Sequence, residues 1–273
     1  MRIINTGDYF GSVRDGVITP LGLDVMAFYA DPDAFKDVDP AAFGLPSAVP
    51  LEDVILHSPV PRPSKILGVG PNYLGHAAEA TVATAASVDD LGWFAAFSSS
   101  VIGPGEDIRI PAGVREIDIE AEIGVVIGRP AHNVTPGEAG SHIAGFVCLN
   151  DVSARELQRR NSLRGKAIDT FFPIGPYLVT PDELGSWQGR AVRSYVNGQC
   201  FQDGSTGDMV FGVEELLSSF SRLLTLEPGD VIATGTPAGT PAYSNPPRYL
   251  QDGDIAAVSV EGLGRLENRV RQC

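Results

Sequence analysis

The pattern of apolar and polar positions along the chain predicts many strands. Ile119–Ile127 and Ile143–Leu149 are apolar runs of strand length. Asn197-Gly198 separates two strand-like stretches, which is a strong signal for a β-hairpin. Further strands are expected at Arg2–Asn5, Gly16–Thr19, Lys65–Val69, Tyr177–Val179, Val192–Val196, Val231–Thr234, Ile255–Val260 and Arg265–Val270.

Helices are expected at Tyr73–Ala86, Ala154–Asn161 and Val213–Leu224. Because strands do not alternate regularly with helices, a doubly wound sheet is disfavoured, and a β-rich α+β sandwich, roll or barrel fits better. Prolines 59, 61 and 63 form a stiff, extended connector. The connector divides the chain into a small N-terminal domain, residues 1–60, and a main domain, residues 61–273.

The formal net charge of −14 narrows the range of partners. A chain this acidic repels phosphate backbones and anionic membranes, so neither nucleic acid nor a membrane is expected as a partner. A small anionic substrate stays compatible, since a metal and a few arginines reverse the local field. The sequence has no apolar run long enough to cross a bilayer, and its first residues lack the pattern of a signal peptide, so the cytoplasm is the expected location.

Three carboxylates are the candidate ligands of a metal ion. Glu120 and Glu122 alternate with apolar residues, so on a strand they point to the same face. Asp151 follows the apolar run Ile143–Leu149 and lies at a strand end. Oxygen ligands of this kind suit Mg²⁺ or Mn²⁺. The alternatives are a solvated strand face for the glutamates and a helix N-cap for Asp151.

Other polar residues provide candidates for proton transfer and substrate binding. His76 and Glu79 are spaced i and i+3, so on a helix Glu79 can orient the imidazole as a general base; the alternative is a surface ion pair. Arg155 and Gln158 have the same spacing, and the arginine can clamp a carboxylate. Two further candidates are Lys166, which can neutralise an oxyanion, and Thr236, which follows a strand and a glycine.

In order along the chain, these segments resemble the fumarylacetoacetate hydrolase family. The resemblance covers about Lys65 to Val270, and the ordered set of motifs is more specific than any one of them. The matching pieces are Lys65–Tyr73, His76–Glu79, Val101–Gly105, Asp118–Gly128, Asn150–Arg155, Lys166 with Asp169-Thr170, Gly175-Pro176, Val196–Gly198, Gln202–Gly204, Asp208-Met209, Glu227–Asp230, Thr234–Gly239 and Asn268–Val270.

The resemblance implies a mixed β-sandwich roll, a small N-terminal domain and a homodimer. It implies Mg²⁺ or Mn²⁺ at the three carboxylates, a His76–Glu79 dyad, and an oxo-acid held by four further residues: Arg155, Gln158, Lys166 and Thr236. The leading functional expectation is metal-dependent C–C bond hydrolysis or decarboxylation of a 1,3-dioxo or 2-oxo acid through an enolate. The alternatives are an isomerase, tautomerase or hydratase of a dienoate, and a catalytically lapsed metal-containing binding protein.

The sequence departs from the family pattern at one substrate-side position. Where the family often has Phe-x-Lys-x-x-Ser, this chain has Phe94–Ser99, which places Ala96 at the lysine position. A methyl group there, with Phe94 and Phe97 beside it, predicts a less positive outer pocket. We therefore expect a substrate whose distal end is uncharged or apolar; the alternative is that Arg109 or Arg115 replaces the missing charge.

Overall fold

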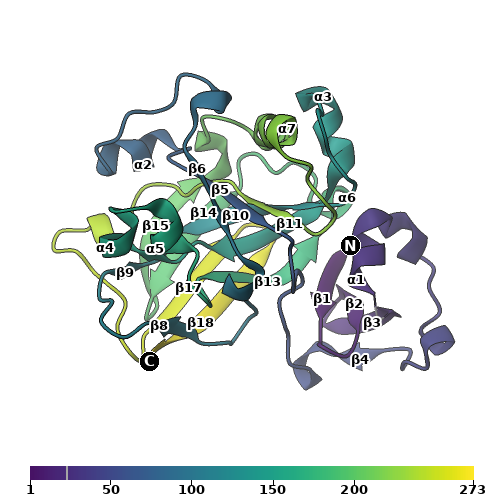
Figure 1. Cartoon of the computed structure of the whole chain (residues 1–273). Helices are drawn as coiled ribbons and strands as arrows, with labels where there is room; N and C mark the ends of the chain where they lie inside the picture. Colours follow the sequence, from purple (N-terminus) through teal and green to yellow (C-terminus); the bar gives the residue numbers. More distant parts are fainter. Residues whose placement is uncertain (23) are drawn as a thin grey trace.

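The computed structural model describes residues 1–22 and 24–273, and strands dominate this part of the chain (Figure 1). Most of them form one large mixed sheet. In spatial order its strands are β4 (Val49–Pro50), β3 (Val17–Gly22), β2 (Phe10–Arg14), β1 (Arg2–Asn5), β13 (Phe172–Val179), β11 (Ile143–Asn150), β10 (Ala121–Ile127), β16 (Val231–Ala233), β5 (Ile66–Val69) and β6 (Trp93–Ala96), with β7 (Val101–Ile102) beside β13.

A second, five-stranded sheet contains the predicted hairpin. Its order is β15 (Gln199–Ser205), β14 (Ala191–Val196), β17 (Ile255–Val260), β18 (Gly264–Gln272) and β8 (Ile108–Ile110). Asn197 and Gly198 join β14 to β15 with φ angles of 52° and 81°. Asparagine and glycine tolerate this left-handed conformation, which explains why the pair marks the turn. Two short strands, β9 (Ile117–Asp118) and β12 (Ser153–Ala154), pair separately.

Side chains on both faces of the large sheet are buried. One face of β10 and β11, including Ile123 and Cys148, packs with Val258 and Leu266 of the second sheet in one apolar cluster. The other face packs in a different cluster, which contains Val126 and Val147 among others. Burial on both faces explains why these strands are almost wholly apolar in sequence. The β-rich, mixed-sheet fold expected from the sequence is confirmed.

The helices are short, with one exception. They are α1 (Val25–Ala30), α2 (Leu74–Glu79), α3 (Pro136–Ala139), α4 (Arg155–Gln158), α5 (Ser162–Lys166), α6 (Pro181–Leu184) and α7 (Val213–Leu223). The helix predicted over Val213–Leu224 is α7, which ends at Leu223, one residue before the predicted end. None of the helices in the described part of the chain is long and apolar enough to cross a membrane.

Two helix predictions are wrong in extent. The helix expected over Tyr73–Ala86 ends at Glu79, because Thr81 adopts a left-handed φ of 55° that ends the regular hydrogen bonding. The helix expected over Ala154–Asn161 ends at Gln158. The Asn161 side chain accepts a hydrogen bond from the Leu163 amide and thereby starts α5 as a separate helix.

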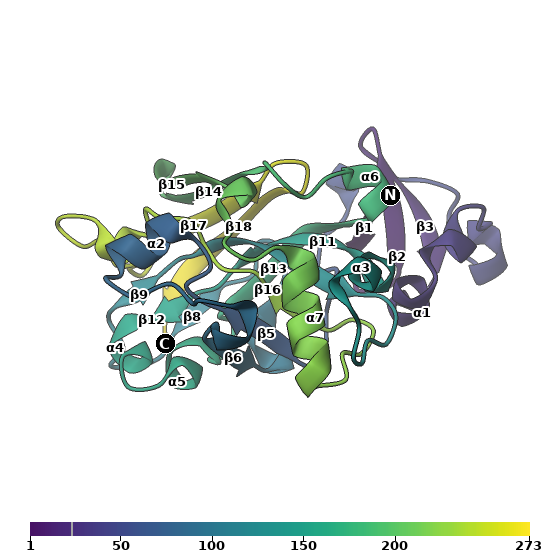
Figure 2. The same ribbon diagram turned by 90° about the horizontal axis from the view of Figure 1, so that it is seen from above.

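The N-terminal strands lie at one end of the molecule, beside α1 (Figures 1 and 2). Strand β1 pairs antiparallel with β13, with Ile3 opposite Leu178, so the large sheet continues into the N-terminal segment. The division of the chain between residues 60 and 61 stays a prediction. The opposite end of the sheet, around β10, β16 and β5, carries the polar residues described next.

Candidate active site

The three predicted metal-ligand carboxylates meet where β10 and β11 lie side by side. Glu120 immediately precedes β10, Glu122 lies within it, and Asp151 follows β11. Pairing of Ala121 with Asn150 brings the two strand ends together, and the Asp151 amide donates to the Glu120 carbonyl oxygen at 2.9 Å. One carboxylate oxygen from each of the three residues lies within 4.8 Å of the others.

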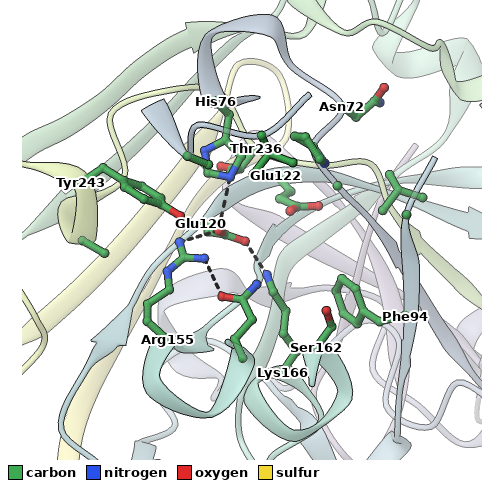
Figure 3. A pocket seen from close by; sticks show the side chains of 18 of the residues that line it. Asn72, His76, Phe94, Glu120, Glu122, Arg155, Ser162, Lys166, Thr236 and Tyr243 are labelled. Atoms are coloured by element: carbon green, nitrogen blue, oxygen red, sulfur yellow. Dashed lines mark hydrogen bonds and ion pairs between the residues drawn. The ribbon is translucent and has the colours of Figure 1, made fainter. Parts of the chain in front are cut away.

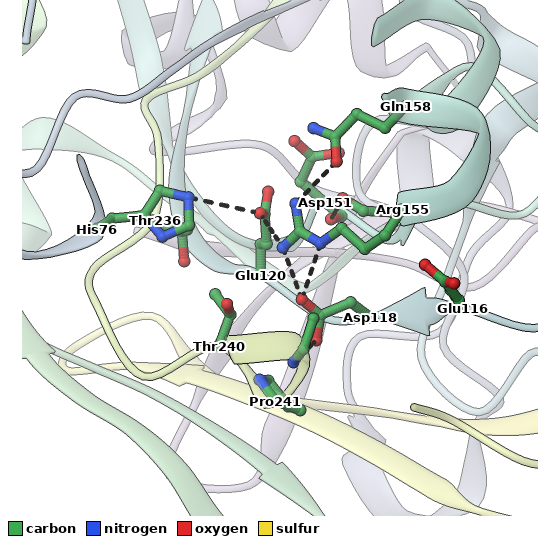
Figure 4. A network of polar contacts seen from close by, with 12 residues as sticks. His76, Glu116, Asp118, Glu120, Asp151, Arg155, Gln158, Thr236, Thr240 and Pro241 are labelled. Carbon is green, nitrogen blue, oxygen red and sulfur yellow. Dashed lines mark hydrogen bonds and ion pairs between the residues drawn. The ribbon is translucent and has the colours of Figure 1, made fainter. Parts of the chain in front are cut away.

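Two buried cations contact this cluster. The Arg155 guanidinium donates from Nε and Nη2 to Asp118 at 3.0 and 2.6 Å, and from Nη2 to Glu120 at 2.5 Å (Figure 4). The Lys166 ammonium donates to Glu120 and to Asp151, both at 2.5 Å. The arginine donors predicted to clamp a substrate therefore bind protein carboxylates in this structure.

The charges in the cluster do not balance. Four buried carboxylates face two buried cations, which leaves an excess of two negative charges, equal in size to the charge of one divalent cation. Oδ1 of Asp151 is buried without a hydrogen-bond partner among the described residues. Burying unpaired charge is costly. The donor set thus fits a divalent cation that prefers oxygen ligands. The six groups are Asp118, Glu120, Glu122, Asp151, Arg155 and Lys166.

The pKa shifts of the cluster carboxylates reflect the same excess of negative charge. Burial alone would raise the pKa of Glu120, but Arg155, Lys166 and His76 outweigh it and hold this pKa below its usual value. Burial, reinforced by the Asp151 charge, raises the pKa of Glu122 well above its usual value. Burial also raises the pKa of Asp151 to about 7, against the opposing effect of Lys166. Glu122 and Asp151 therefore favour ionisation only when more positive charge is present.

His76 stands beside the carboxylates and is held by its predicted partner. Its Nδ1 lies 2.7 Å from Oε1 of Glu79, and its Nε2 lies 3.7 Å from Oε1 of Glu120 (Figure 3). Glu79 in turn accepts a hydrogen bond from the Gly239 amide at 2.8 Å. Because the glutamate accepts, Nδ1 carries a proton, and Nε2 is the ring nitrogen that faces the cluster.

A cavity of about 500 Å³ opens onto this site, and Glu120 and Glu122 are among the residues that line it. Gln158 accepts from Arg155 through Oε1 at 2.9 Å, so its Nε2 amide group is the part that can donate to a ligand. The Thr236 hydroxyl donates to the Ala121 carbonyl at 2.8 Å and accepts from Gln202 at 2.6 Å. The lining includes Asn72, His76, Trp93, Phe94, Arg155, Gln158, Arg159, Ser162, Lys166, Thr236, Tyr243 and Tyr249.

The sequence interpretation missed three residues of this site. Asp118 holds Arg155, and Gln202 ties Thr236 to the end of β10 by accepting from the Ala121 amide. The Tyr243 ring meets His76 edge-on, and the Arg155 guanidinium lies over its face. The two-residue spacing of Asp118, Glu120 and Glu122 is the signal that could have found the aspartate, since it predicts one shared face, although Asp118 lies in β9 and Glu122 in β10. No local pattern marks the glutamine or the tyrosine.

Comparison with known proteins places the chain in a family. A family model described as the fumarylacetoacetate (FAA) hydrolase C-terminal region matches residues 65–271. The chain belongs to the fumarylacetoacetate hydrolase family. A human protein named as a mitochondrial oxaloacetate tautomerase is 39% identical over 226 residues, which are 81% of this chain and 71% of that protein. The resemblance to this family that the sequence motifs indicate is therefore confirmed.

Solved structures of the family share the whole fold. A Mycobacterium smegmatis structure described as 5-carboxymethyl-2-hydroxymuconate delta-isomerase is 33% identical with a TM-score of 0.82, and covers 100% of both chains. A Sphingobium maleylpyruvate hydrolase, solved with manganese(II) and pyruvate, is 27% identical with a TM-score of 0.83, and covers 100% of this chain and 99% of the other. Fumarylacetoacetate hydrolase family members of this kind are hydrolases, isomerases and tautomerases, and this protein is an enzyme of that family.

Proposed function

We propose that this protein is a divalent-metal-dependent enzyme that interconverts the keto and enol forms of a small 2-oxo acid. The position of His76 carries the proposal. Its Nδ1 is held by Glu79, and its Nε2 faces Glu120 at 3.7 Å, where a base can reach the carbon next to the keto group. The tautomerase name of the 39% identical human relative supports the same reaction class.

The carboxylate cluster would hold the metal, and Mg²⁺ and Mn²⁺ both suit it. Glu120, Glu122 and Asp151 are the ligands that we propose. A bound divalent cation acts as a Lewis acid and stabilises negative charge that develops on the keto oxygen. The manganese in the Sphingobium structure supports a divalent ion in this family.

The remaining site residues orient the acid and support the developing charge. Lys166 places an ammonium beside Glu120 and Asp151, where it can stabilise an enolate oxygen. Arg155 holds Glu120 and Gln158 in place, and the Gln158 amide is available to the substrate carboxylate. Thr236, whose hydroxyl is engaged by the protein, contributes to the wall beside β10. In the keto-to-enol direction His76 takes the proton from carbon, and the keto oxygen gains a proton from the imidazolium or from solvent; the reverse direction takes the proton from the enol oxygen and returns one to carbon, with Glu79 fixing the imidazole.

Hydrolysis of a C–C bond in a dioxo acid is the second candidate. The same base can activate a water, and the 27% identical structure described as a maleylpyruvate hydrolase supports this possibility. The order of the two candidates is reversed from the sequence-based expectation, because tautomerase relatives share more identity with the chain. A lapsed binding protein is disfavoured, since both members of the dyad and Lys166 lie at the cluster. The homodimer and the cytoplasmic location stay predictions.

Product analysis by mass spectrometry separates the two reactions. Incubation of the Mg²⁺- or Mn²⁺-loaded enzyme with a panel of 2-oxo and 2,4-dioxo acids in D₂O should leave the acid intact and speed its uptake of deuterium next to the keto group if the enzyme is a tautomerase. Hydrolysis would give two fragments that together contain one added water. A chelator-treated sample is the control in each case. Cleavage of a dioxo acid with no acceleration of keto–enol exchange would overturn the first proposal and support the second.

A further inference from the structure

The segment 239–243 connects the dyad to the arginine–carboxylate network. At one end, the Gly239 amide donates to Oε2 of Glu79 at 2.8 Å. Near the other end, the Ala242 amide donates to Oδ1 of Asp118 at 3.1 Å. Figure 4 shows Thr240 and Pro241 of this segment next to Asp118. Segment 239–243 is therefore hydrogen-bonded to Glu79 on one side of the carboxylate cluster and to Asp118 on the other.

Tyr243 is the last residue of this segment, and its side chain contacts both His76 of the dyad and Arg155 of the network. Its ring meets the His76 imidazole edge-on, with ring centroids 5.9 Å apart and an angle of 74° between the planes. The Arg155 guanidinium lies over the same ring, 5.5 Å from its centroid. In Figure 3 the tyrosine stands on the opposite side of the pocket from Phe94, and its hydroxyl points inward.

The position of His76 depends on such contacts. The imidazole is carried by α2, which has only six residues and ends just before the left-handed Thr81. A helix this short has little stability of its own, so tertiary contacts determine where it lies. Glu79 belongs to the same helix, and the Gly239 amide of segment 239–243 ties it to the rest of the chain. Tyr243 instead links the imidazole to Arg155, which is anchored to Asp118 and Glu120.

We propose that Tyr243 is a positioning residue whose ring holds His76 in register with the carboxylate cluster. The inference rests on the proposed function, in which the imidazole moves the proton. Aromatic edge-to-face and cation–π contacts are made by the ring and not by the hydroxyl. Phenylalanine should therefore replace the tyrosine, and alanine should not.

Three variants test the role of the ring in turnover. Tyr243→Phe should keep kcat within about twofold, and Tyr243→Ala should lower kcat by roughly 10- to 100-fold, the scale of a misplaced catalytic group. KM and the Mn²⁺ dissociation constant should hardly change. Tyr195→Ala is the matched control, because that ring makes a similar contact with Arg265, at 4.5 Å, away from the cavity. Unchanged kcat in Tyr243→Ala, or an equal loss in Tyr243→Phe, would overturn the proposal.

A second readout does not depend on turnover. In histidine-labelled protein, the imidazole resonances of His76 are assigned by their loss in His76→Gln. The ring current of Tyr243 should shift these resonances in wild type and in Tyr243→Phe, and the shift should disappear in Tyr243→Ala. Resonances that stay unmoved in the alanine variant would contradict the contact itself. This measurement gives an answer even if the enzyme acts on no 2-oxo acid in the panel.

Discussion

The Lys166 ammonium nitrogen lies 2.5 Å from Oδ2 of Asp151, at the centre of the acidic cluster. Burial alone would lower the pKa of this lysine, but Asp151 and Glu120 outweigh it, so the pKa is raised and the group stays charged. The lysine therefore serves as a permanent cation beside the proposed metal ligands. Its charge is placed to act on substrate oxygens that approach the same carboxylates.

Replacing the lysine should separate metal binding from turnover. Lys166→Met removes a cation that stabilises the developing enolate, so kcat should fall by roughly 10²- to 10³-fold, the scale for loss of one oxyanion-stabilising group. The Mn²⁺ dissociation constant should not increase, because the variant removes positive charge from the metal site. Steady-state kinetics and Mn²⁺ titration measure the two effects. Weakened metal binding with a normal kcat would show that the lysine supports the metal site instead.

Glu122 should be required for metal binding. Glu122→Gln removes one of three charged ligands, while its apolar strand neighbours keep β10 in place. In wild type, Mn²⁺ should raise Tm, because a ligand that binds only the folded state stabilises it by about 2.7 kcal/mol at a hundred times its Kd. The Gln variant should fold but lose most of this shift. Glu116→Gln, outside the three-carboxylate cluster, is the control, and a wild-type shift in Glu122→Gln would exclude this ligand set.

Metal affinity should depend on pH. Burial raises the pKa of Asp151 to about 7 in the metal-free protein. The pKa of Glu122 is also raised, so a proton on either carboxylate competes with the metal. The apparent Kd should therefore weaken by at least about tenfold per pH unit as the pH falls below about 7. Calorimetry across about pH 5 to 8 measures the trend. An apparent Kd that does not change over this range would show that no proton is linked to metal binding.

The expectation that the Ala96 methyl group faces the outer pocket is wrong. Ala96 is buried, pairs across the sheet with Ile66, and does not line the cavity, whereas Trp93 and Phe94 do. Leaving a distal carboxylate unpaired in a partly dry pocket costs on the order of 1–3 kcal/mol. Because Trp93 and Phe94 line this wall of the cavity, we expect a monocarboxylic 2-oxo acid to have a higher kcat/KM than its dicarboxylic analogue, by at least several-fold, although oxaloacetate, the acid in the human relative's name, is dicarboxylic.

Arg159 is the residue that would oppose this preference. It lines the cavity, although it pairs with Glu116 at 2.7 Å; Arg109 and Arg115, the alternatives expected from the sequence, are not among the lining residues. Because Ala96 is buried outside the cavity lining, Arg159→Gln is the variant that tests the source of charge, and it should strengthen any preference for the monocarboxylate. A clear preference of wild type for the dicarboxylate, lost in Arg159→Gln, would show that Arg159 supplies the charge.

The sequence predicts the parts of the site that depend on local periodicity. Alternation along 119–127 places Glu120 and Glu122 on one face, and an apolar run ending at Asn150 places Asp151 at a strand end; the structure brings all three together. Tyr243 lies far along the chain from both of its partners, and only the path of segment 239–243 brings them into contact. Such contacts depend on tertiary packing, which the local periodicity of the sequence does not predict.

The helix lengths were mispredicted for a related reason. Residues 80–86 are mostly alanine and threonine and have no polar stop signal, yet the chain leaves the helix at Thr81. The contacts of α2 with the carboxylate network, rather than its own propensity, determine where it ends and where His76 points.

The rate of enol-to-keto conversion of a 2-oxo acid tests the proposed function most directly. Stopped-flow absorbance follows decay of the enol in the presence of Mn²⁺-loaded wild type, chelator-stripped wild type and loaded His76→Ala. We predict acceleration by loaded wild type only, with His76→Ala slower by roughly 10²- to 10⁴-fold, the usual contribution of a general base. His132→Ala, at an exposed histidine outside the cavity lining, should behave as wild type. Stripped enzyme, or His76→Ala, that works as fast as loaded wild type would contradict the proposed function.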